Sequence, residues 1–166
     1  MSIGTWNITS IQGKEAEIVS EVKRFRLGIL GVAETKKKGN GEMQLVEGYN
    51  LIYSGVSKEE RAREGVGIIV SETLKNHITE WEPINSRIIT AKIQIEKEKY
   101  TLIQIYAPTE DKGKEERENF YQDLQRTINK VKQRDAHLYI MGDWNGRIGK
   151  EDTRGHGTMG KHAGES

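Results

Sequence analysis

The chain has 166 residues and a formal net charge of +1, from 26 basic and 25 acidic side chains. That length suits one domain with a hydrophobic core, and the charge balance gives no argument for or against a polyanionic partner. The absence of cysteine excludes disulfides, zinc–thiolate sites and thiol catalysis. No apolar run approaches the roughly 20 residues of a membrane helix, so we expect a soluble protein with no membrane partner.

A strand and an amphipathic helix open the chain. Residues 3–8 have the composition of a short strand whose end carries Asn7. Residues 14–25 place apolar side chains at helical spacing with charged residues between them, and Thr9 or Ser10 is the candidate N-cap. We therefore expect a polar strand end immediately before a helix.

Three more strands are expected in the first half of the sequence. Residues 27–32 are apolar on both faces, which predicts a strand buried in a sheet with neighbours on each side. This strand leads into Glu34 and then into a basic loop at residues 36–40. The pattern predicts a further pair of strands, joined by the highly charged segment 58–64, at residues 49–54 and 66–70.

The second half contains a predicted turn, a hairpin and a long helix. The turn is expected near Trp81 and Pro83, before two strands of alternating pattern at residues 87–95 and 100–106. Residues 110–132 carry one apolar stripe at helical spacing, and their basic C-terminal end suits the helix dipole.

The last predicted strand points to a candidate site. Residues 138–141 have the length and composition of a buried strand that stops at Gly142, and Asp143 and Asn145 follow directly. At a strand end, two side chains at this spacing point the same way, so a carboxylate and an amide can converge on one ligand. Oxygen ligands suit a hard cation such as Mg²⁺, or a phosphate held beside one. We expect one wall of a catalytic cleft here.

Polar side chains recur where the predicted strands end: Asn7, Glu34, Tyr106, Asp143 and Asn145. Open sheets bind ligands in the crevice beyond the carboxyl ends of their strands, so the recurrence is more informative than any one residue. Each has an ordinary explanation on its own. These are a turn or helix cap for Asn7, a solvated carboxylate for Glu34, a strand end for Tyr106, and an Asx turn for Asp143 with Asn145.

Four short motifs stand at these strand ends, in the order Thr5-Trp6-Asn7, Ala33-Glu34-Thr35, Ile105-Tyr106-Ala107-Pro108 and Gly142-Asp143-Trp144-Asn145. Together they resemble the endonuclease/exonuclease/phosphatase superfamily, which includes deoxyribonuclease-I-like nucleases and apurinic-site endonucleases. Within it, the order of elements is similar to the endonuclease domain of RTE-type non-LTR retrotransposons. The resemblance covers nearly the whole chain. It implies an α+β fold, a four-layer α/β/β/α sandwich with two mixed sheets.

The resemblance also implies roles for the strand-end residues. Glu34, assisted by Asn7, would bind Mg²⁺, or Mn²⁺ in its place. Asp143 would orient or deprotonate the attacking water, Asn145 would hold that water or a phosphate oxygen, and Tyr106 would stabilise charge on the scissile phosphate of DNA. Further candidates for contact with substrate phosphates are Arg87, Lys36, Lys37, Lys38 and His162, although a lysine run is more often a solvated loop.

Family members continue to another aspartate and to a Ser/Thr-Asp-His ending, and neither is present in this sequence. We therefore expect a C-terminally truncated domain over residues 1–149, with the glycine-rich residues 150–166 as a flexible tail or loop of the same domain. The second sheet would be incomplete. Its open edges and exposed apolar surface would favour self-association or a covering partner.

These expectations leave three functions open. The first is a Mg²⁺-dependent DNA endonuclease, of retrotransposon type or domesticated, acting inside the cell in the nucleus, and impaired where the terminal histidine is missing. The second is a catalytically inactive remnant that binds nucleic acid or protein. The third keeps the phosphoester chemistry but acts on a phosphorylated small molecule, such as an inositol phosphate or a sphingolipid. The basic loop argues against this third function.

Overall fold

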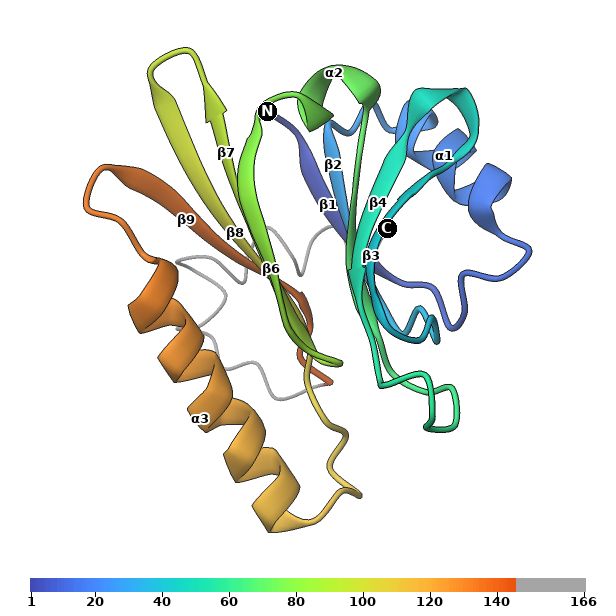
Figure 1. The fold of residues 1–166 in the computed structure, drawn as a ribbon, viewed down its shortest axis with the longest axis vertical. Coiled ribbons are helices and arrows are strands. Elements are labelled where there is room, and N and C mark those ends of the chain that lie inside the picture. The colour runs from blue at the N-terminus through green and yellow to red at the C-terminus, as the bar shows by residue number, and fades with distance from the viewer. Residues whose placement is uncertain (146–166) are drawn as a thin grey trace.

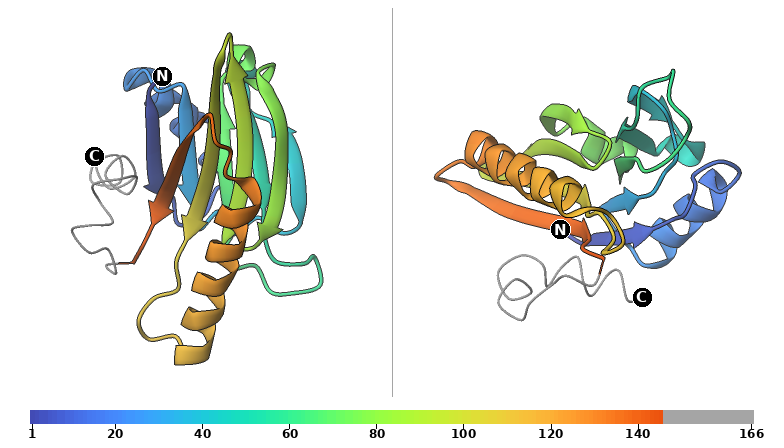
Figure 2. Two further views of the ribbon diagram at one scale, coloured as in Figure 1. Left: turned by 90° about the vertical axis from the view of Figure 1, so that its left-hand side faces the viewer. Right: turned by 90° about the horizontal axis from the view of Figure 1, so that it is seen from below.

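The computed structural model describes residues 1–145 of the chain (Figure 1). The tail predicted at residues 150–166, His162 within it and the domain end predicted at residue 149 lie outside the described residues. Two β-sheets pack face to face, and one long helix lies outside each sheet (Figures 1 and 2). The predicted four-layer α/β/β/α sandwich is therefore confirmed.

The first sheet has five strands in the order β1-β2-β5-β4-β3. They are β1 (Ile3–Asn7), β2 (Ile29–Ala33), β3 (Asn40–Gln44), β4 (Asn50–Ser54) and β5 (Val66–Val70). β1 and β2 are parallel and the other pairs are antiparallel, so the sheet is mixed, as predicted. Every residue of β2 is buried, which fits a strand with a neighbour on each side.

The second sheet has four strands among the described residues, in the order β6-β7-β8-β9. They are β6 (Ile78–Asn85), β7 (Ile88–Ile95), β8 (Glu98–Tyr106) and β9 (Ala136–Asp143). β8 and β9 are parallel, whereas β6, β7 and β8 pair antiparallel, so this sheet is also mixed.

Two predictions about the second sheet are wrong. Trp81 and Pro83 do not form a turn but lie within β6. In the described part of the chain β6 is an edge strand, where proline is tolerated because no strand there pairs with its outer side. The last strand does not stop at Gly142 but continues to Asp143, and within residues 1–145 it lies at the other edge of the sheet. Gly142 has a φ of 136°, and a Cβ atom there would overlap the backbone of Ile105.

The helices cover the outer faces of the two sheets. α1 (Glu15–Arg24) packs three buried side chains against the first sheet, and α3 (Lys114–Val131) packs its apolar stripe against the second. Neither Thr9 nor Ser10 caps α1, because its N-cap is Lys14, and the Ser10 hydroxyl instead accepts a hydrogen bond from the Gln12 N–H. The sequence pattern does not predict β3, the 3-10 turn η1 (Val46–Gly48) or the short helix α2 (Glu72–Lys75).

A buried polar contact joins the two sheets close to the strand ends that carry the candidate residues. Gln104 of β8 is fully buried, and its Nε2 donates to the Thr5 hydroxyl of β1 at 3.3 Å. Gly31 of β2 makes room for it, because a Cβ atom at that position would overlap the Gln104 amide. Thr5 and Gln104 each lie two residues before a predicted site residue, Asn7 and Tyr106, so the contact helps to fix how the two strand ends face each other.

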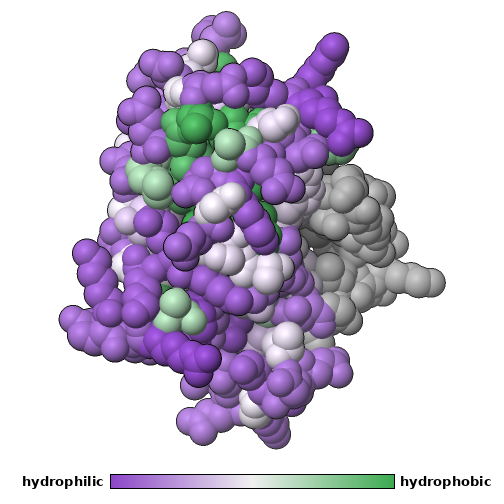
Figure 3. Space-filling view, turned by 90° about the vertical axis from the view of Figure 1, so that its right-hand side faces the viewer, coloured by the Kyte–Doolittle hydropathy of each residue, from purple (hydrophilic) through white to green (hydrophobic). Residues whose placement is uncertain are grey.

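The surface over α1, β3 and β4 is largely hydrophilic, with a small hydrophobic area (Figure 3). In residues 1–145 the exposed large hydrophobic side chains come from four separate segments: Met1, Phe25, Val46 and Tyr121. Among these residues, β1, β3, β6 and β9 are the edge strands, and self-association through them stays a prediction. No helix in the described part of the chain is long and apolar enough to cross a membrane.

Candidate active site

The strands that lead to the candidate residues all terminate at the same end of the sandwich. β1 and β2 run parallel and pair Asn7 with Ala33, the residue before Glu34. β8 and β9 also run parallel and pair Tyr106 with Asp143. These four strand ends lie at the lower end of the two sheets in Figure 1, above the lower part of α3.

Two hydrogen bonds cross from one sheet to the other at this end of the sandwich. The Asn7 Nδ2 donates to Asp143 Oδ2 at 2.9 Å, and the Tyr106 hydroxyl donates to Glu34 Oε1 at 3.4 Å. The structure thus brings together four residues that are far apart in the sequence. The catalytic and metal-binding roles of these residues stay predictions.

Burial and nearby negative charges favour the protonated form of Tyr106. Burial raises the pKa of the Tyr106 hydroxyl above its ordinary value, and the negative charges of Glu34 and Asp143 raise it further, against a lowering effect of Arg87. The hydroxyl is therefore a hydrogen-bond donor at neutral pH. On the other side of Glu34, the Lys36 ammonium lies 3.7 Å from Oε2.

Asp143 is held at both carboxylate oxygens. Oδ1 accepts a hydrogen bond from the Asn145 backbone N–H at 2.8 Å, which is an Asx turn, while Oδ2 accepts from Asn7. The Asn145 side chain turns elsewhere, because its Nδ2 donates to the Ala107 carbonyl. Asp143 therefore forms the expected Asx turn and also contacts Asn7 across the sheets. Asn145 contacts Asp143 through its backbone N–H and not through its side-chain amide. Asn7 likewise forms a turn, with Oδ1 accepting from the Thr9 N–H at 3.0 Å.

The residues at this end of the sandwich suit a hard divalent cation. Glu34 offers a carboxylate, and Asn7 offers an amide. Asn7 pairs in register with Ala33, the residue before Glu34. Residues 1–145 contain no cluster of three or more His, Cys, Asp or Glu side chains that could hold a metal ion. Mg²⁺ usually keeps several water ligands and takes only one or two protein carboxylates, so it does not require such a cluster, and Mg²⁺ at this position stays a prediction.

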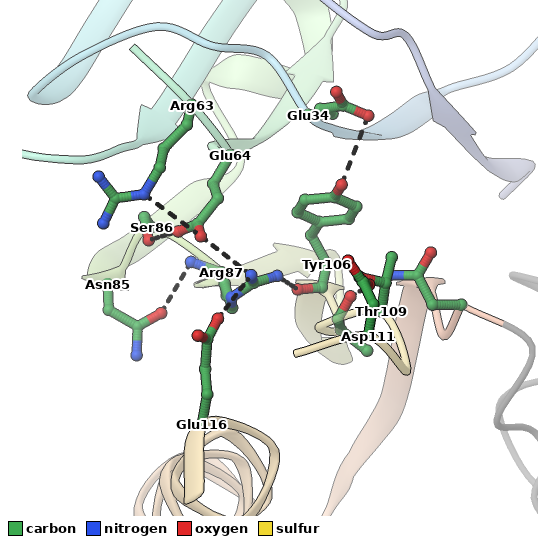
Figure 4. A network of polar contacts seen from close by, with 12 residues as sticks. Glu34, Arg63, Glu64, Asn85, Ser86, Arg87, Tyr106, Thr109, Asp111 and Glu116 are labelled. Carbon is green, nitrogen blue, oxygen red and sulfur yellow. Dashed lines mark hydrogen bonds and ion pairs between the residues drawn. The ribbon is translucent and has the colours of Figure 1, made fainter. Parts of the chain in front are cut away.

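Arg87 faces the interior. Only 10% of its side chain is exposed, and its guanidinium donates to Glu64 at 2.9 Å, to Glu116 at 3.1 Å and to the Tyr106 carbonyl at 2.9 Å (Figure 4). These partners favour an internal role over the predicted contact with substrate phosphates. Sequence reasoning missed Glu64, which belongs to a charged segment and lies 23 residues before Arg87, so no local pattern links them.

The predicted basic loop lies beside Glu34. The Lys36 side chain is exposed, and its ammonium shares the Glu34 carboxylate with Tyr106. The Lys37 ammonium lies 4.8 Å from the centre of the Tyr53 ring, a cation–π contact. Both lysines therefore have partners within the chain, and contact with DNA stays a prediction.

The chain belongs to the Endonuclease/Exonuclease/phosphatase family, whose model matches residues 4–164. This family comprises hydrolases that act on phosphodiester bonds and typically use divalent metal ions. The match confirms the resemblance inferred from the four strand-end motifs.

Individual relatives agree with this assignment. The chain is 34% identical to craniofacial development protein 2 of Bos taurus over 154 residues, which are 92% of this chain and 25% of that protein. Its structure is similar to the 3′ phosphatase NExo from Neisseria bound to a product DNA hairpin, with a TM-score of 0.65, 18% identity, and coverage of 87% of this chain and 58% of that one. It is also similar to the endonuclease domain of TRAS1, a telomere-specific non-LTR retrotransposon, with a TM-score of 0.63, 16% identity, and coverage of 97% and 68%. At these identities the two solved structures show a shared fold.

Proposed function

We propose that this chain is part of a Mg²⁺-dependent DNA endonuclease, of retrotransposon type or domesticated, that acts in the nucleus. The observation that carries the proposal is the meeting of Glu34, Tyr106, Asn7 and Asp143 through two hydrogen bonds between the sheets. The fold shared with a retrotransposon endonuclease and with an enzyme bound to product DNA supports DNA as the substrate.

Phosphodiester hydrolysis requires a positioned water, neutralisation of charge on the phosphate and help for the leaving oxygen. Mg²⁺, held by Glu34 with Asn7 beside it, supplies the charge neutralisation when bound. Asp143 is fixed at both oxygens, so it can orient the attacking water and accept its proton. Tyr106, held protonated, can turn its O–H from Glu34 to an oxygen of the scissile phosphate.

Nicking of supercoiled DNA with and without Mg²⁺ tests this proposal. We expect the parent chain to nick the DNA only with Mg²⁺, and Glu34→Ala and Asp143→Ala to lower the rate by at least about 100-fold. Glu82→Ala is the matched control, because Glu82 is a partly exposed carboxylate of β6 paired with Lys130 at 2.7 Å. Equal nicking by the parent and both site variants would indicate a contaminating nuclease.

A binding module without turnover is the second candidate. Neither histidine in residues 1–145 reaches the site: His77 contacts the Gln94 carbonyl, and His137 contacts Glu98. The described residues therefore supply no imidazole acid or base. Binding of labelled DNA measured beside the nicking assay separates the two functions, because a binding module retains DNA without cleaving it.

A further inference from the structure

We propose that Glu64 is a positioning residue that joins the Glu34 loop to Tyr106. Its carboxylate holds Arg87 against Tyr106 (Figure 4), and its backbone carbonyl holds the loop that carries Glu34. The proposal rests on the proposed function, because it assigns Glu64 to the same phosphodiesterase site.

The Glu64 carboxylate lies within a largely buried network. Only 15% of the side chain is exposed, and its Oε2 lies 2.9 Å from the Arg87 Nη2. Its Oε1 accepts a hydrogen bond from the Ser86 hydroxyl at 2.5 Å, and Arg63 approaches Oε2 at 3.5 Å from the more exposed side. Charge-assisted hydrogen bonds to a shielded carboxylate are short and directional, so they restrict how the Arg87 guanidinium can turn.

Arg87 carries this restraint to Tyr106. Its Nη1 donates to the Tyr106 carbonyl at 2.9 Å, and its carbonyl accepts from the Tyr106 N–H at 3.0 Å. The centre of the guanidinium also lies 5.2 Å from the centre of the Tyr106 ring. A planar guanidinium can stack on the ring and donate in its own plane at the same time, which an ammonium cannot. Arg87 therefore fixes both the backbone and the ring of Tyr106.

The backbone carbonyl of Glu64 holds the loop that follows Glu34. Its carbonyl accepts from the Lys36 N–H at 2.7 Å, and the next carbonyl, that of Gly65, accepts from the Thr35 N–H at 3.1 Å. These two amides belong to the residues that directly follow Glu34. Glu64 has a φ of 55°, in the left-handed region, and in this conformation it reaches Arg87 with its side chain and the Glu34 loop with its carbonyl.

Glu116 is a natural comparison within the same network. It also pairs with the Arg87 Nη2, at 3.1 Å, but it extends from α3 and 47% of its side chain is exposed. In the described part of the chain, no hydrogen bond connects Glu116 to residues 34–36. Removing the charge of Glu116 should therefore disturb Tyr106 less than removing the charge of Glu64.

Two measurements on the full chain test the proposal. The chain is labelled with 3-fluorotyrosine, and the ¹⁹F resonance of Tyr106 among the six tyrosines is assigned by its loss in Tyr106→Phe. We expect this resonance to shift or broaden in Glu64→Gln and to change clearly less in Glu116→Gln. In the nicking assay, Glu64→Gln should lower kcat by about tenfold, with KM changed by less than about twofold, because the groups that act on the phosphate are misplaced.

A double variant separates positioning from general stability. If Glu64 acts through Tyr106, Glu64→Gln should lower kcat no further when added to Tyr106→Phe. An unchanged Tyr106 resonance in folded Glu64→Gln, or fully additive losses in the double variant, would overturn the proposal. If the parent chain does not cleave DNA, the proposed function fails and the ¹⁹F result still decides the role of Glu64. If Glu64→Gln does not fold, the same two measurements are made on Ser86→Ala. This variant removes only the hydrogen bond to the Glu64 Oε1.

Discussion

The two halves of the candidate site are supported in different ways. Glu34 directly follows β2 and Tyr106 ends β8, and both strands are interior in their sheets, whereas Asn7 and Asp143 end β1 and β9, which are edge strands within residues 1–145. Behind Tyr106 lies the buried pair of Arg87 with Glu64, whereas Asn7 and Asp143 are fixed by local turns and by each other. The Glu34–Tyr106 half is therefore carried by strands that are paired on both sides. The other half depends on strands that have a free edge within residues 1–145.

The largest expected effect comes from Arg87→Met, which removes the support behind Tyr106. The variant leaves the Glu64 carboxylate largely buried without its main partner, so we expect the free energy of unfolding to fall by about 3 kcal/mol. Urea denaturation measures this change. The control is Lys130→Met, which breaks the exposed pair with Glu82 and should cost less than about 1 kcal/mol. An equal fall in the free energy of unfolding in the two variants would show that the Arg87 network stabilises the fold no more than an exposed ion pair.

A smaller effect on stability is expected from Asn7→Ala, which breaks the contact between the edge strands. Asn7 is exposed, so water can replace its hydrogen bond to Asp143, and the free energy of unfolding should fall by less than about 1 kcal/mol. Mg²⁺-dependent cleavage should fall by at least about tenfold, because Asp143 loses one of its two restraints. A stability loss as large as that of Arg87→Met would contradict the difference between the two halves.

The smallest expected effect is a dependence of stability on alkaline pH. Because the pKa of Tyr106 is raised on folding, chiefly by burial and then by Glu34, its contribution to stability is present below the pKa of an unfolded tyrosine. That contribution is lost as the pH rises through the higher folded-state pKa. Urea denaturation from about pH 9 to pH 11 should therefore show a fall that is smaller in Tyr106→Phe. Identical pH profiles for the two proteins would rule out this contribution.

Much of the candidate site follows from residue patterns, because strand ends are a local property. Alternation and apolar runs locate the strand that precedes Glu34 and the strands that carry Tyr106 and Asp143, and the long helix α3 lies inside the predicted range. Whether a strand lies at the edge of its sheet is not a local property, because it depends on pairing with distant residues. Pro83 suggests a turn in the sequence, yet it is compatible with a strand that has a partner on one side only.

The sequence by itself determined the order of the main strands, the two long helices and the polar residues at the strand ends, because periodicity and turn residues act over a few positions. Only the tertiary structure decided which of those residues touch. Asn7 and Asp143 are 136 residues apart, and Glu34 and Tyr106 are 72 apart, so their contacts depend on how the two sheets pack. Tertiary packing also turned Arg87 inward and gave it Glu64, a residue of a charged segment, because a largely buried guanidinium requires a charged partner.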